Sequence, residues 1–249
     1  MTKNTNPVFS TIETGTTHYA DTDAATYKGI FLKTGLFTLI TVAVALLVAY
    51  YLPVILDNNP TGLYVTLGIS GMIGFFSVMF GRFSARGAKY AGVIYGVCQG
   101  IALGTVSAIC EAYFPGIAML AILSTIALFA VMLILYTTGI LRNCSFIRKL
   151  AYGMSFGAIA LLLVSSLLGL FVPTLFNNMG LLIGLEAFFL IYGVITLIFN
   201  FDEAYMVVES GCTKDAEWNV SLGLLVSIVY IYVEVLRILM LILANNDNS

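Results

Sequence analysis

The stretch MGLLIGLEAFFLIYGVITLIF (residues 179–199) decides the fold class. It is mostly apolar and contains one acid, Glu186. A helix needs about 20 consecutive apolar residues to cross the hydrocarbon core of a bilayer. The next six residues, NFDEAY (200–205), then place Asp202 and Glu203 side by side where this predicted membrane helix ends. These two carboxylates are either an ordinary polar cap or part of a site that moves ions.

The composition of the whole chain agrees with a membrane protein. Of 249 residues, 60% are hydrophobic and only 10% are charged, whereas a soluble domain carries about 25% charged residues. We therefore expect an all-α integral membrane protein whose main partner is the lipid bilayer. The net charge of −2 and the lack of a basic run argue against a nucleic-acid partner.

The same length criterion predicts seven membrane-spanning helices. Short polar or Gly/Pro-bearing stretches separate them. Residues 1–28 lack apolar residues enough to pack, so we expect a flexible cytosolic tail before a transmembrane domain over residues 29–249. The predicted spans are Thr34–Leu52, Leu63–Phe80, Ala91–Cys110, Ile117–Leu141, Ala151–Phe171, Met179–Phe199 and Val220–Leu243.

Basic residues predict the direction in which the helices cross. Loops retained in the cytoplasm are enriched in lysine and arginine. Such residues occur in the N-terminal segment and after the second, fourth and sixth spans, and the opposite loops have none. We therefore expect the N-terminus in the cytosol and the C-terminus outside. The basic residues are Lys3, Lys28, Lys33, Arg82, Arg86, Lys89, Arg142, Arg148, Lys149 and Lys214.

The third span carries a glycine at every fourth position: Gly92, Gly96, Gly100 and Gly104. This spacing places all four on one helix face. Small residues on one face let a second helix approach closely in lipid. A tight packing seam is the simpler interpretation, and a pore lined by the glycines is the alternative.

Three ionisable residues are predicted to lie at about the same depth in the outer half of the membrane. Glu234 and Arg237 are three residues apart and share a face of the last span, and Glu186 lies at a similar depth in the sixth span. A charge at the middle of a membrane helix costs about 2.5–3.5 kcal/mol, so pairing is expected. The cluster is either a Glu234–Arg237 pair that neutralises itself or an acid site with a net charge of −1 that passes protons or cations.

Acids also gather at the predicted cytosolic end of the sixth span. Asp202 and Glu203 are followed in the loop by Glu209, Asp215 and Glu217, against one lysine. Neighbouring carboxylates repel one another when both are ionised. The group is therefore a candidate for ion passage or pH sensing, and a solvated helix end is the alternative.

Two long segments resemble one family. LIFNFDEAYMVVESGCTKDAEWNVSLGLLVSIVYIYVEVLRILMLIL (197–243) resembles the C-terminal signature of the Bax inhibitor-1 family, in its bacterial YccA-like branch. The matching features are an aspartate ending the sixth span (Asp202), the pair Glu217–Trp218, and a run containing Tyr230, Tyr232, Glu234 and Arg237. IALGTVSAICEAYFPGIAMLAILSTIALFAVMLILYTTGIL (101–141) is similar to the family's third and fourth spans.

The resemblance implies a seven-helix fold with the last helix at its centre, in the bacterial plasma membrane. It also implies a pH-sensitive cation leak, with Ca²⁺ or H⁺ as candidate ions. In such relatives an aspartate near the end of the sixth span shares a proton with an aspartate in the last span. Asp202 or Glu203 matches the first position, but Ser227 stands at the second and cannot ionise.

If a pH switch persists in this chain, its partners come from elsewhere. Glu203 or Glu217 is a candidate second acid, and Arg82 is a candidate counter-cation that closes the cytosolic mouth. A different function suggested by the resemblance is a non-conducting regulator that binds a membrane protease or other membrane proteins.

Enzyme functions are disfavoured. GMSFG (153–157) fits the G-x-S-x-G pattern of a serine nucleophile, but the only histidine, His18, lies in the predicted tail and not in a span. The four cysteines form no CxxC pair, so we expect no metal site and no cofactor.

Overall fold

The computed structural model describes residues 24–58, 60–83, 85–139 and 179–247, which are almost entirely helical. These ranges contain six helices, each long and apolar enough to cross a membrane. The chain is therefore an all-helical, multi-pass membrane protein. The helices are α2 (Tyr27–Asn58), α3 (Pro60–Phe83), α4 (Ala85–Tyr113), α5 (Ile117–Thr137), α7 (Met179–Glu209) and α8 (Lys214–Asp247).

Six of the seven predicted spans coincide with these helices, and the fifth, residues 151–171, lies outside the described residues. Most helices extend beyond the predicted limits: α2 begins at Tyr27 and α7 continues to Glu209. Hydropathy marks the stretch that crosses the hydrocarbon, but the backbone hydrogen-bond ladder continues into the polar interface. The exception is α5, which ends at Thr137, before a turn at Gly139 with a φ of 85°.

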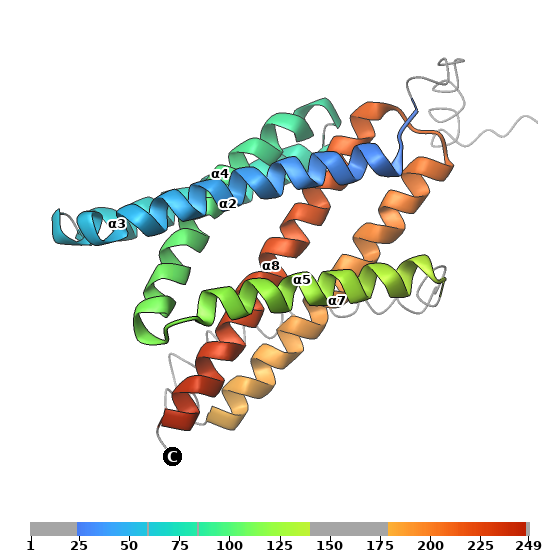
Figure 1. Cartoon of the computed structure of the whole chain (residues 1–249). Helices are drawn as coiled ribbons and strands as arrows, with labels where there is room; N and C mark the ends of the chain where they lie inside the picture. Colours follow the sequence, from blue (N-terminus) through green and yellow to red (C-terminus); the bar gives the residue numbers. More distant parts are fainter. Residues whose placement is uncertain (1–23, 59, 84, 140–178, 248–249) are drawn as a thin grey trace, which may run out of the picture.

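The last helix, α8, is the central element of the described bundle. It contacts each of α2, α3, α4, α5 and α7. In Figure 1 it runs between the group formed by α2, α3 and α4 and the pair formed by α5 and α7. Leu222 and Leu225 of α8 have no exposed surface. The side chains that α8 presents to its neighbours therefore lie in the interior of the bundle.

The glycine face of α4 packs against α2. A Cβ placed on Gly100 would lie 2.7 Å from the carbonyl oxygen of Thr41 and 2.7 Å from the Cβ of Val44. A Cβ on Gly104 would meet the backbone of Ala45. Because the obstacles are backbone atoms and a Cβ, only glycine permits this separation of the two helices. The face is filled by another helix, which is what a packing seam requires.

One end of the bundle is organised around the connection between α7 and α8, residues 210–213. Gly211 adopts a φ of 65° and ends α7, with the Cys212 N–H donating to the Val207 carbonyl over 3.2 Å. Ala24 forms a β-bridge with Thr213. The start of α2 is therefore joined to this connection, and we call this end of the bundle the loop end. Of the predicted tail, residues 1–23 lie outside the described residues.

Candidate functional site at the loop end

The carboxylates of NFDEAY do not cap a helix. The α-helix continues through them to Glu209, so the cap interpretation is wrong. Three polar side chains of this helical segment reach different helices. Asn200 contacts α8, Asp202 contacts Tyr136 of α5 and Glu203 contacts Arg82 of α3. Residues adjacent in sequence are separated on a helix surface because successive side chains point about 100° apart.

Arg82 connects three helices at the loop end. Its Nη1 atom donates to both oxygens of Glu203, at 3.0 and 2.9 Å. Its Nη2 atom donates to Oδ1 of Asn200 at 3.3 Å, and Nη1 also lies 3.4 Å from Oδ1 of Asn219 on α8. Asn219 in turn donates to the carbonyl of Arg82 at 3.3 Å. We refer to Arg82, Asn200, Glu203 and Asn219 as the Arg82 hub.

Arg82 and Glu203 are only partly shielded from solvent. The Arg82 side chain is 37% exposed and that of Glu203 is 26% exposed. An ion pair at this degree of exposure stabilises a protein by about 1 kcal/mol or less. The charge attraction between Arg82 and Glu203 is therefore modest, and the hydrogen bonds of Asn200 and Asn219 add to it.

Behind the hub lies a neutral pair in the interior. Asn200 is 2% exposed, and its Nδ2 donates to Oγ of Ser227 at 2.6 Å and to the carbonyl of Gly223 at 3.2 Å. Ser227 is also 2% exposed. The α7 residue that faces Ser227 is thus Asn200, which the sequence did not single out, and not Asp202 or Glu203. Neither partner in this pair can ionise.

Glu217 does not join the acids of α7. It lies in the first turn of α8, is 2% exposed, and contacts the start of α2. Lys33 Nζ lies 2.6 Å from Oε2, and the backbone N–H of Thr26 donates to Oε1 over 2.7 Å. Lys33 also sits 4.5 Å from the centre of the Trp218 ring. Glu217 therefore fixes α2 to α8, and the proposed position over the mouth is not observed.

The three ionisable residues of the other half of the bundle do come together. Arg237 Nη1 lies 3.3 Å from Oε1 and from Oε2 of Glu186. The same nitrogen lies 3.9 Å from Oε1 of Glu234. The strongest contact of Arg237 is therefore between helices, and the pair within α8 is the longer one.

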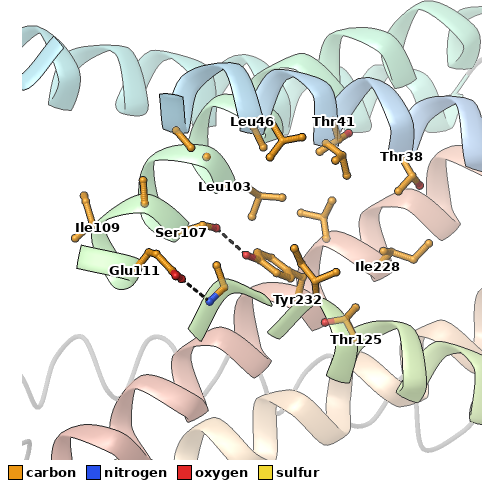
Figure 2. A pocket seen from close by; sticks show the side chains of 18 of the residues that line it. Thr38, Thr41, Leu46, Leu103, Ser107, Ile109, Glu111, Thr125, Ile228 and Tyr232 are labelled. Atoms are coloured by element: carbon orange, nitrogen blue, oxygen red, sulfur yellow. Dashed lines mark hydrogen bonds between the residues drawn. The ribbon is translucent and has the colours of Figure 1, made fainter. Parts of the chain in front are cut away.

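A cavity of about 890 Å³ lies between α2, α4, α5 and α8. Figure 2 shows its lining, which is mostly apolar. The polar side chains at its surface are largely engaged: Ser107 and Tyr232 share a hydrogen bond of 2.7 Å, and Glu111 accepts from the N–H groups of Gly116 and Ala118. No row of acids crosses the cavity among the described residues that line it.

No group of three His, Cys, Asp or Glu side chains suited to a metal ion occurs in the described ranges.

Comparison with known proteins identifies the chain at the level of a family. The sequence model of the family described as Bax inhibitor 1 like matches residues 6–244. No curated protein and no solved structure matches the chain.

Proposed function

Because the chain belongs to the Bax inhibitor 1 like family, we propose that it is a pH-sensitive cation leak of the plasma membrane, closed at the loop end by the Arg82 hub. Ca²⁺ and H⁺ are the candidate ions. The observation that carries the proposal is the contact of Arg82 on α3 with both carboxylate oxygens of Glu203 on α7. It joins helices that are distant in sequence at the end where the sequence predicts the cytosolic mouth.

The hub supplies a physical reason for closure. Without the negative charge of Glu203 the attraction to Arg82 is lost, and the contact between α3 and α7 weakens. Removal of that charge should therefore increase the leak. Asn200 and Ser227 cannot contribute a proton of their own, so a switch based on two carboxylates at that place does not operate in this chain.

The experiment is cation flux into liposomes that hold the purified protein and a trapped calcium dye, from mildly acidic to mildly alkaline pH. Glu203→Gln removes the negative charge that contacts Arg82, so it should leak more than the wild type at every pH. Glu209→Gln is the matched control, because Glu209 is exposed near the same end of α7 and its contact with the Tyr27 hydroxyl is long, at 3.5 Å. It should behave as the wild type does.

Two results would contradict the hub as the gate. A Glu203→Gln variant with the flux and pH dependence of the wild type would refute it. If Asp202→Asn altered the flux and Glu203→Gln did not, the gate would lie at the contact between Asp202 and Tyr136 instead.

A second candidate function is a non-conducting regulator that binds other membrane proteins, and the cavity between α2, α4, α5 and α8 favours it. This cavity has a mostly apolar lining, and several residues that line it, among them Leu46 and Ile126, are exposed. An apolar recess of this kind suits a helix or side chain of another membrane protein better than it suits an ion. If liposomes that hold folded protein show no more cation flux than empty liposomes, this regulator function would be favoured over the leak.

A further inference from the structure

The half of the bundle away from the loop end has two carboxylates and one cation in contact. Glu186 of α7 and Glu234 of α8 both approach the same nitrogen of Arg237, at 3.3 and 3.9 Å. If both acids were ionised, this group would have a net charge of −1 within the membrane-spanning part of the chain. Such a charge is costly there.

The two acids differ in how far their side chains are buried. The Glu234 side chain is 5% exposed, and the Glu186 side chain is 12% exposed. Arg237 is nearer to Glu186, where it contacts both oxygens. Among the described residues, Oε2 of Glu234 has no hydrogen-bond partner although it is buried. An ionised oxygen in this position would lose its hydration and gain no donor in return.

Glu186 and Tyr230 also lie within hydrogen-bonding reach of the Glu234 carboxyl group. Even so, no donor among the described residues reaches Oε2 of Glu234. The Tyr230 hydroxyl donates to the carbonyl of Phe189 on α7, at 3.3 Å. Tyr192 of α7 stacks edge-on against the Tyr230 ring, with 5.9 Å between ring centres.

The remaining helices packed against this part of α8 add no cation from their described residues. In α5 the one titratable side chain is Tyr136, which contacts Asp202 near the loop end. In α4 the nearest groups are Cys110 and Glu111, which lie beside Tyr232. Arg237 is therefore the cation that both acids must share.

We infer that Glu234 is a proton-binding site, with the hydrogen ion held on its buried Oε2 and Arg237 left to neutralise Glu186. The proton comes from water: a hydronium ion transfers it to the carboxylate and becomes a water molecule. The inference goes beyond the proposed function, because it concerns the other half of the bundle and holds whether or not the chain conducts ions.

The test is infrared difference spectroscopy of the full chain in lipid membranes, recorded from mildly acidic to alkaline pH. A protonated carboxylic acid has a carbonyl band that is separate from the carboxylate and amide bands. The wild type should show this band, and ¹³C labelling of the glutamate carboxyl groups should shift it. It should vanish as the pH rises. Glu234→Gln should lack the band, and the exposed control Glu209→Gln should retain it.

A second variant tests the sharing of Arg237. In Glu186→Gln, Glu234 has the arginine to itself and should ionise, so its band should disappear at a lower pH than in the wild type. Wild-type protein that shows no glutamate band at any pH would overturn the inference, as would a band that remains in Glu234→Gln. If Glu234→Gln does not fold, a Glu186→Gln band with the wild-type strength and pH dependence overturns it.

Discussion

The packing of α4 on α2 makes a quantitative prediction for Gly100→Ala. The added methyl group would lie 2.7 Å from the carbonyl oxygen of Thr41, whereas ordinary contact begins at 3.4 Å. The obstacle is backbone, so α2 and α4 must separate by about 0.7 Å, the difference between these two distances. Overpacking of this kind typically costs about 1–3 kcal/mol.

A matched control separates this cost from the intrinsic preference of alanine for helices. Gly68 lies within α3 and is exposed, and a Cβ there would meet no described atom within 4 Å. Both substitutions gain about 1 kcal/mol of helix propensity. The difference between the two variants therefore isolates the packing term, and Gly68→Ala should be at least as stable as the wild type.

The assay is the loss of the monodisperse peak in size-exclusion chromatography after heating in detergent. With about 2–4 °C of melting temperature per kcal/mol for a chain of this size, Gly100→Ala should melt on the order of 5 °C below Gly68→Ala. Equal melting temperatures, or a more stable Gly100→Ala, would show that α2 and α4 are not in close contact at this glycine.

Two further predictions concern buried polar contacts. Glu217→Gln removes the charge that Lys33 approaches at 2.6 Å; because hydrogen bonds to charged groups contribute about 1.5–3 kcal/mol, the variant should melt below the wild type, and an unchanged melting temperature would contradict the contact. Tyr232→Phe removes the 2.7 Å hydrogen bond to Ser107 and should cost about 1 kcal/mol. Combined with Ser107→Ala, it should cost less than the sum of the two single changes, and additive costs would argue against the bond.

Much of the fold could be predicted from the sequence, because a membrane-spanning helix is recognisable as a long stretch of apolar residues. The six described helices coincide with predicted spans, and α8 contacts every other described helix. The glycine spacing in α4 indicated one crowded face, but it did not indicate that α2 would be the neighbour. That choice depends on contacts between helices, which periodicity within one helix does not encode.

The candidate site was harder to predict for the same reason. Asp202 and Glu203 are adjacent in sequence, and they were grouped together on that ground. In the helix they point to different neighbours, so Glu203 reaches Arg82 and Asp202 reaches Tyr136. Asn200 is an uncharged residue beside two acids, so charge patterning does not single it out, although its buried amide donates a hydrogen bond to Ser227 of α8.

The two halves of the bundle differ in the number of carboxylates that contact each arginine. At the loop end Arg82 contacts one acid, Glu203, and also forms hydrogen bonds with Asn200 and Asn219. In the other half one arginine serves two acids, and an oxygen of Glu234 is left without a donor among the described residues. We therefore expect the loop end to respond to perturbations of an ion pair, and the other half to respond to the binding of a single proton.

The central claim is that attraction between Arg82 and Glu203 keeps the loop end closed. Charge exchange tests it most directly, through cation flux in liposomes for Arg82→Glu, Glu203→Arg and the double variant that carries both changes. Each single change places like charges together, which repel, so both single variants should leak more than the wild type. The double variant restores an opposite pair and should return towards the wild-type flux. A double variant that leaks as much as either single one, or single variants that do not leak, would contradict the account.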